Sequence, residues 1–199
     1  MLSVGASVYY RPRDRAVHAD AAHAAFARGS AGDHGALVAV FRGWADAGFS
    51  TQWCYEHYVQ ARSMKRARDV REQVLGLLER CEVELRSNPE DGDALRKAVT
   101  AGYFYNVAAL QRDGRYKTVK KPQTVHVHPS SALAQAQPRW IVFHELVLTT
   151  KEYARVASEI KPDWLVDVAP HFYSRKEVEA QAVKKLPKSL GKAAGKEGG

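Results

Sequence analysis

The side chains best suited to bind a ligand are the basic residues between Arg62 and Arg71. This segment has only one acid, Asp69, against five cations, which are Arg62, Lys65, Arg66, Arg68 and Arg71. Aromatic rings lie just upstream, at Trp53, Tyr55 and Tyr58. Cations attract phosphate oxygens and flat rings can stack on bases, so this combination suits a nucleic-acid backbone. The alternative is an ordinary solvated helix face, because Lys65 and Asp69 have the i,i+4 spacing of a helix ion pair.

The same segment has the apolar pattern of an amphipathic helix. Apolar residues recur there at helical spacing, namely Val59, Ala67, Val70, Val74, Leu77, Leu78 and Cys81. Such a stripe predicts a helix that packs one side on a core. Most of the cations lie off the stripe, so they must face solvent or a partner.

A second pair of residues with possible chemistry is His126 and His128, two apart on a predicted strand. They would share one face, which permits a metal site in principle, although surface or hydrogen-bonded histidines have the same spacing. The chain has no GxxxxGK[ST] motif, and Gly191-Lys192 and Gly195-Lys196 lack both its spacing and its hydroxyl. No zinc spacing and no nucleophile elbow occur either. We therefore expect no catalytic residue, metal site or cofactor site in this chain, and no binding of ATP.

Composition favours an anionic partner. The net charge is +8, and the segment from Ser174 to the end holds seven basic and three acidic residues, so +4 lies there and +4 in the rest. The two cysteines, Cys54 and Cys81, are too few for a disulfide framework, which fits a reducing compartment. No apolar run approaches the length of a membrane span, and the N-terminus lacks the order of a signal peptide.

The first part of the chain, 1–88, predicts a helical bundle. Helices are expected from Asp14 or Asp20 to about Arg28, from near Asp33 to Gly48, and along the basic segment. Ser50 or Thr51 is the expected cap of the aromatic stretch that leads into the basic helix. Short connections between helices are typical of an antiparallel bundle.

The second part, 93–173, predicts an initial helix from Asp93 followed by a small barrel. A polar linker with Pro89 and Gly92 separates it from the first part. The expected strands are Arg115–Lys120, Thr124–His128, Trp140–Thr150 and Tyr153–Ile160. Several short strands with long loops favour an OB-fold. The fold class is thus α+β, and we expect the Lys- and Gly-rich residues 174–199 to form a basic disordered tail.

The predicted barrel also carries candidate binding residues. Arg115, Lys117, Lys120 and Lys121 lie on or beside its first hairpin. The Ser130-Ser131 turn could offer hydroxyls and backbone amides to phosphates. A turn whose serines cap themselves would have the same sequence.

Several longer motifs resemble one family, the DEAH-box RNA helicases of pre-mRNA splicing. They are GDH (32–34), WCYEHYVQARSMKRARDVREQ (53–73), LRKAVTAGYFYNVA (95–108), HPSSAL (128–133), WIVFHELVLTTKEY (140–153) and WLVDVAPHFY (164–173). The resemblance is to the C-terminal part of these helicases, in nearly unbroken order from Met1 to Tyr173. It is nearest to the member that activates the spliceosome before the first transesterification.

This resemblance implies a helical "ratchet" (helicase-associated) domain followed by an OB-fold, with RNA passing between them and two RecA-like motor domains. The motor domains would hold ATP and Mg²⁺, and we expect them in a longer parent protein that is an ATP-dependent RNA helicase. Carried over by position, the expected RNA contacts are Gln60, Arg62, Arg66, Lys117, Thr118, Ser130 and Ser131.

The implied function is an RNA-binding accessory module that guides single-stranded RNA, in the nucleus, for a splicing helicase. The implied partners are the motor domains, a Gly-patch activator and components of the spliceosome. The alternative is a protein-interaction module that docks such an activator and contacts RNA little by itself.

Overall fold

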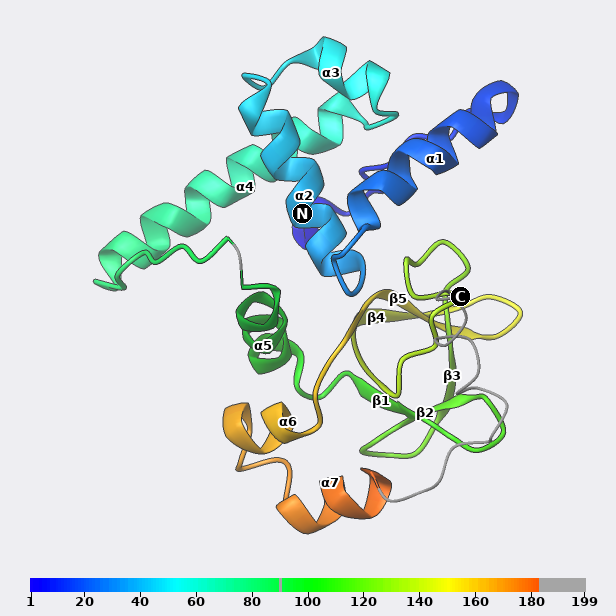
Figure 1. Cartoon of the computed structure of the whole chain (residues 1–199). Helices are drawn as coiled ribbons and strands as arrows, with labels where there is room; N and C mark the ends of the chain where they lie inside the picture. Colours follow the sequence, from blue (N-terminus) through cyan, green and yellow to red (C-terminus); the bar gives the residue numbers. More distant parts are fainter. Residues whose placement is uncertain (90, 183–199) are drawn as a thin grey trace, which may run out of the picture. The chain divides into compact units, whose positions relative to one another are not determined.

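The computed structural model describes residues 1–89 and 91–182 and has two compact units, Met1–Gly92 and a second unit that begins at Asp93 (Figure 1). The first unit is helical, and the second combines helices with a closed five-stranded barrel. The predicted α+β class, with an OB-fold after a helical region, is therefore confirmed. No helix in the described part of the chain is both long enough and apolar enough to cross a membrane.

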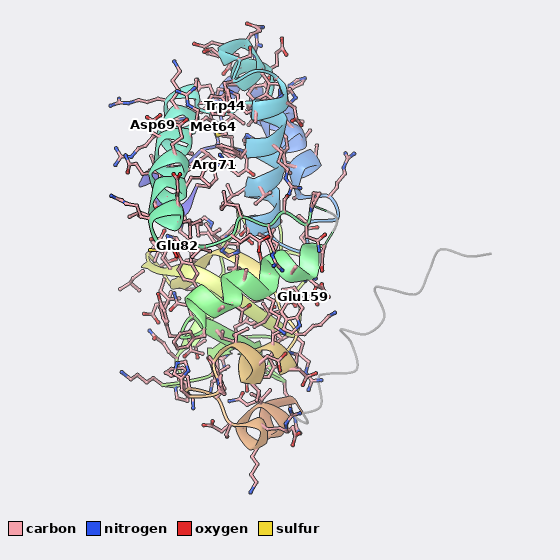
Figure 2. The ribbon with its side chains drawn as sticks, turned by 90° about the vertical axis from the view of Figure 1, so that its left-hand side faces the viewer. Trp44, Met64, Asp69, Arg71, Glu82 and Glu159 are labelled. Carbon is pink, nitrogen blue, oxygen red and sulfur yellow. The ribbon has the colours of Figure 1, made fainter. Side chains whose placement is uncertain are left out.

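The first unit is built from short 3₁₀ turns and four α-helices. Their bounds are η1 Leu2–Val4, η2 Arg13–Arg15, α1 Ala16–Ala27, α2 Asp33–Asp46, α3 Thr51–Glu56 and α4 Ala61–Arg80. One hydrophobic cluster joins them, with Val40, Trp44, Cys54 and Met64 almost fully buried. Figure 2 shows Trp44 and Met64 between α2 and α4, and Asp69 on the side of α4 that faces away from α2. This cluster is the core against which α4 is held.

The chain turns between the aromatic segment and the basic helix. Ser50 caps α3 by accepting a hydrogen bond from the Trp53 backbone nitrogen at 3.3 Å. After α3, Tyr58 adopts a left-handed backbone (φ 54) and the Val59 nitrogen donates to the Cys54 carbonyl at 2.8 Å. This arrangement ends one helix and lets α4 start afresh at Ala61. Thus the aromatic rings and the cations lie on two separate helices.

Only the first half of the predicted apolar stripe on α4 is buried. Val59 and Ala67 are buried and Val70 is half-buried, but Val74 is 46% exposed, Leu77 is 51% exposed and Cys81 is exposed. The expectation that the whole stripe packs on a core was therefore wrong for Val74, Leu77 and Cys81. The reason is the extent of the core: the hydrophobic cluster of the first unit contains Ala61 and Met64 from the start of α4, and the helix, about 30 Å long at 1.5 Å per residue, continues beyond it.

The second unit consists of a barrel and three helices that pack on it through one hydrophobic cluster. Its elements are α5 Gly92–Tyr103, β1 Val107–Leu110, β2 Tyr116–Thr118, β3 Thr124–Val127, β4 Trp140–Leu148, β5 Glu152–Glu159, α6 Asp163–Val168 and α7 Arg175–Ala182. The barrel closes in the order β1-β2-β3-β5-β4, and every neighbouring pair is antiparallel except β3 with β5. This is a five-stranded barrel of the OB type.

Both faces of β1 are buried, which is why the sequence pattern did not reveal it. Ala108 and Leu110 join the cluster inside the barrel, with Val125, Ile141 and Phe143. Val107 and Ala109 instead join the cluster beneath α5, α6 and α7. A strand that is covered on both sides shows no alternation of apolar and polar residues. The sequence VAAL is also poor in β-branched and aromatic residues, so neither signal of a strand was present.

The prediction of disorder from Ser174 onward was wrong for residues 175–182, which form α7. Ser174 and Glu177 form a capping box: the Ser174 backbone nitrogen donates to the Glu177 carboxylate at 3.0 Å, and the Glu177 nitrogen donates to Ser174 Oγ at 3.3 Å. Val178 is buried in the cluster on the barrel. The rest of the predicted tail, 183–199, lies outside the described residues.

Candidate nucleic-acid interface

The cations of α4 fall into two groups according to what their side chains contact. Arg62, Lys65 and Arg66 are exposed and, in the part of the chain that the structure describes, make no ion pair, side-chain hydrogen bond or cation–π contact. They occupy the first two turns of the helix. The predicted contact residues Arg62 and Arg66 therefore have side chains that are available to an external anion.

Arg68 and Arg71 lie instead on aromatic rings of the same unit. The Arg68 guanidinium carbon is 5.4 Å from the centre of the Phe49 ring, and that of Arg71 is 5.9 Å from the centre of the Phe41 ring. Arg68 Nε also lies 3.9 Å from Glu72, at the i,i+4 spacing of a helix ion pair. Arg68 and Arg71 are thus engaged by side chains of the first unit.

Gln60, the third predicted contact in this unit, is the N-cap residue of α4. Its side-chain nitrogen donates to the Tyr9 carbonyl at 3.3 Å, and its backbone nitrogen donates to the Val8 carbonyl at 2.8 Å. The side chain is exposed but already ties the start of α4 to the N-terminal segment. Its visible role is to hold the helix start in place beside Arg62.

The three rings upstream of α4 do not form one surface. Trp53 stacks on His57, with ring centres 4.1 Å apart and planes 17° apart, and packs against the core of the first unit. The Trp53 ring also fills the space above Gly43, where an added Cβ would approach it to 2.9 Å. Tyr55 is 71% exposed. Trp53 is thus a packing residue, and Tyr55 is the ring of the three that is open to solvent.

The cations of the barrel divide in the same way. Arg115 pairs with Asp113 at 2.6 Å, and this hydrogen-bonded guanidinium lowers the pKa of the Asp113 carboxyl. Lys120 pairs with Glu177 at 2.8 Å and lies over the rings of Phe172 and Tyr173. Lys117 and Lys121 are exposed, and within the described residues their side chains have no such partner. The free positive charge of the hairpin is therefore that of Lys117 and Lys121.

The predicted hydroxyl contacts are engaged in local turns. Thr118 Oγ1 donates to the Lys121 carbonyl at 2.9 Å and accepts from the Gln123 nitrogen at 2.9 Å, which shapes the turn between β2 and β3. Ser130 Oγ lies 2.7 Å from His128 Nδ1, and Ser131 Oγ accepts from the Leu133 nitrogen at 3.2 Å. The self-capping turn is thus the arrangement observed. Ser130 is exposed, and its hydroxyl can still reach a ligand.

The structure also brings together residues that sequence reasoning did not join. β3 pairs in parallel with β5, with His126 opposite Tyr153. The Tyr153 ring lies 6.0 Å from the His126 ring and 5.5 Å from the His128 ring, measured between ring centres. The histidine spacing was visible in the sequence, but Tyr153 is distant along the chain and no local pattern could link it to them. In the described ranges, 1–89 and 91–182, no group of three or more potential metal ligands comes together.

Comparison with known protein families agrees with this geometry. Residues 95–173 match the family described as oligonucleotide/oligosaccharide-binding (OB)-fold. OB-fold domains of this family occur at the C-terminus of DEAH-box helicases. This match agrees with the closed five-stranded barrel of the second unit, which therefore has an OB-fold.

Proposed function

We propose that this chain is the RNA-guiding C-terminal module of a DEAH-box RNA helicase of pre-mRNA splicing. In this proposal both α4 and the barrel contact single-stranded RNA, and an ATP-driven pair of RecA-like domains, with their ATP and Mg²⁺, belongs to a longer parent protein that works in the nucleus. The match of 95–173 to an OB-fold family is the observation that carries the proposal. The splicing motifs quoted above support the finer assignment.

The free cations explain how such a module would hold a strand. Arg62, Lys65 and Arg66 lie at the exposed start of α4, and Lys117 and Lys121 lie on the barrel hairpin. Phosphate contacts position a strand without reading its sequence, since they do not touch base edges. We therefore expect weak binding with little sequence preference.

A second candidate function is a protein-docking module for a Gly-patch activator or a spliceosomal component. It is favoured by exposed apolar side chains in and after the second half of α4, which are Val74, Leu77, Val83 and Leu85. Acidic residues flank them at Glu72, Glu79, Glu82 and Glu84. Such a surface suits a protein partner better than RNA, because its carboxylates would repel phosphates.

Salt dependence distinguishes the two functions. The full chain is titrated against a labelled single-stranded oligouridine of about 12 nucleotides, within the range that one OB-fold covers. If about three to five phosphates are neutralised, log K should fall against log salt with a slope of roughly −2 to −3.5, at about 0.7 per contact. An absence of binding at low salt, or an affinity that salt does not change, would contradict the RNA-guiding function and leave the docking function.

A further inference from the structure

The outer face of β3 and β5 carries a group of aromatic side chains with no role in the core. Thr124, His126 and His128 alternate with the inward-facing Val125 and Val127, so they share the outer side of the barrel. On β5 the inward residue is Ala154, which places its neighbour Tyr153 on the same outer side as His126. Three rings from two strands thus meet on one surface.

The rings are held by different means. His128 is fixed by the 2.7 Å contact between its Nδ1 and Ser130 Oγ. His126 Nδ1 is buried without a hydrogen-bond partner in the described residues, so this ring is placed by packing against Tyr153. Tyr153 lies between the two histidines, tilted by 55° to His126 and by 74° to His128. Both imidazoles therefore lie at an angle to the tyrosine ring, and neither is stacked parallel to it.

The Tyr153 side chain is partly buried, and its hydroxyl has no hydrogen-bond partner in the described part of the chain. It contrasts with Tyr116 and Tyr173, whose hydroxyls donate to backbone carbonyls and whose pKa values are raised by burial. Those two tyrosines are structural. Tyr153 has neither the burial nor the hydrogen bond that would explain it as a core residue.

A free cation lies along the same surface. Lys117 on β2 is opposite Thr124, two residues before His126 on β3. β2 and β5 lie on opposite sides of β3, so Lys117 is about 10 Å across the sheet and about 7 Å along it from Tyr153, measured on the backbone. The surface therefore offers a flat ring and, on the second strand over, a positive charge.

We propose that Tyr153, flanked by His126 and His128, is a stacking site for one unpaired base, with Lys117 holding a phosphate of the same strand. The site takes the base of a single-stranded oligonucleotide and reads no base edge, since every base has a face that can stack. This inference rests on the proposed RNA-binding function and adds a specific subsite to it.

Two variants of the full chain test the stacking role. Tyr153→Leu removes the ring but keeps an apolar side chain, and Tyr153→Phe keeps the ring and removes the hydroxyl. Because one base–aromatic stack contributes about 1–3 kcal/mol, Tyr153→Leu should weaken binding of an oligouridine by about 5-fold or more. Tyr153→Phe should bind like the wild type. The salt slope should stay the same in both variants, because Tyr153 is uncharged.

Oligonucleotides with abasic positions separate stacking from backbone contact. Wild-type protein should lose affinity for an abasic strand, whereas Tyr153→Leu should bind the abasic and the complete strand about equally. The loss caused by Tyr153→Leu should be the same for RNA and for DNA, because stacking does not use the 2′-hydroxyl. A loss confined to RNA would overturn stacking in favour of a hydroxyl contact.

The outcomes distinguish this inference from the function on which it rests. If the wild-type protein binds the oligonucleotide and Tyr153→Leu binds it equally well, the stacking site alone is overturned. An absence of binding by the wild type at low salt would overturn the proposed function and the stacking site together. Thermal unfolding of each variant is measured alongside. If Tyr153→Leu fails to fold, the binding of complete and abasic strands by Tyr153→Phe is compared with that of the wild type instead. In that case, binding by Tyr153→Phe with wild-type sensitivity to abasic strands would support stacking, and insensitivity of both proteins to abasic strands would overturn it.

Discussion

Four arginines of α4 have two different physical roles. Arg68 and Arg71 cover the rings of Phe49 and Phe41, where a cation is attracted to the face of the ring. The side chains of Arg62 and Arg66 are exposed to solvent and, in the described residues, lie over no aromatic ring. The first pair therefore supports the packing of α4, and the second pair is free to act on a ligand.

Two double variants should separate these roles. Changing Arg62 and Arg66 to Ala should change the free energy of unfolding by about 0.5 kcal/mol or less per site, as for other exposed substitutions. It should reduce the salt slope of RNA binding by up to about 1.4, at about 0.7 per phosphate contact. Denaturant unfolding and the salt titration measure the two quantities.

The matched control changes Arg68 and Arg71 to Ala. It should lose about 0.5–1 kcal/mol of stability for each cation–π contact and alter the salt slope less than the first variant does. If the Arg62 and Arg66 variant melted early yet bound RNA normally, those side chains would pack rather than bind.

A second residue-scale prediction concerns Glu177 and the pH dependence of stability. The Lys120 ammonium, followed by the Ser174 backbone and hydroxyl, lowers the pKa of Glu177 from 4.5 to about 2. A carboxyl whose pKa is depressed on folding stabilises the protein above its unfolded pKa, and this contribution is lost as pH falls. The stability advantage of wild type over Glu177→Gln should thus be full above about pH 5 and disappear between about pH 4.5 and pH 2.

Urea unfolding across this pH range measures the difference. Glu179→Gln is the matched control, because Glu179 lies on the same helix, is exposed, and has no ion pair within the described residues. Its stability difference from wild type should be small throughout. A Glu177→Gln difference that persists at pH 2 would show that the carboxylate charge is not the cause.

At the scale of the element, α4 has a buried half and an exposed half. Its start is fixed by Met64 and Ala67 in the core, while Val74 and Leu77 lie beyond that core and face solvent. The free cations Arg62, Lys65 and Arg66 lie in the anchored half, so packing holds the backbone that carries them. The exposed half carries the apolar and acidic surface that favours the protein-docking function.

Truncation of apolar residues along α4 should reveal this division. Met64→Ala should cost about 2–5 kcal/mol, because it leaves a cavity in a fully buried site. Val74→Ala should cost about 0.5 kcal/mol or less, since the side chain is largely exposed and little burial is lost. Denaturant unfolding of both variants gives the two values. Similar costs at the two positions would mean that the second half of α4 is covered in solution.

At the scale of the whole molecule, the hydrophobic clusters belong to separate units. Val40, Trp44 and Met64 form the cluster of the first unit. The barrel interior and the layer beneath α5, α6 and α7 form two clusters in the second unit. A unit that has its own core can fold by itself.

The piece of chain from Asp93 to Gly199 should therefore fold without the first unit. Circular dichroism should report strand content, and thermal unfolding should show a cooperative transition for this piece alone. Val142→Ala, which truncates a side chain fully buried between the barrel and the helices, should lower its midpoint and serves as the control. A gradual, non-cooperative melt of the piece would show that the barrel requires the helical unit.

Removal of residues 183–199 tests how much of the RNA affinity depends on residues 1–182. This segment holds five lysines and one glutamate, so it carries +4 of the net charge of +8. Ending the chain at Ala182 keeps α7 and its buried Val178. Affinity for single-stranded RNA should weaken but persist, because the free cations of α4 and the barrel remain. A complete loss of binding would place the RNA site in the removed segment.

The sequence by itself determined most of the helices, the fold class and the position of four strands. These elements follow from local patterns: apolar spacing, Gly and Pro breaks, and caps such as Ser50. The spacing of Ser174 and Glu177 also indicates a capping box, whereas the basic composition around it indicates disorder. Local patterns are sufficient here because capping and amphipathicity act within a few residues of the chain.

Only the tertiary structure decided which of these residues are free. β1 could not be recognised before its two covering layers were known, and Val74 could not be called exposed before the extent of the core was known. The pairing of His126 with Tyr153 depends on the parallel contact between β3 and β5 that closes the barrel. Such contacts join residues that are distant along the chain. They are driven mainly by hydrophobic burial, which is non-directional, so no local sequence pattern specifies which residues will meet.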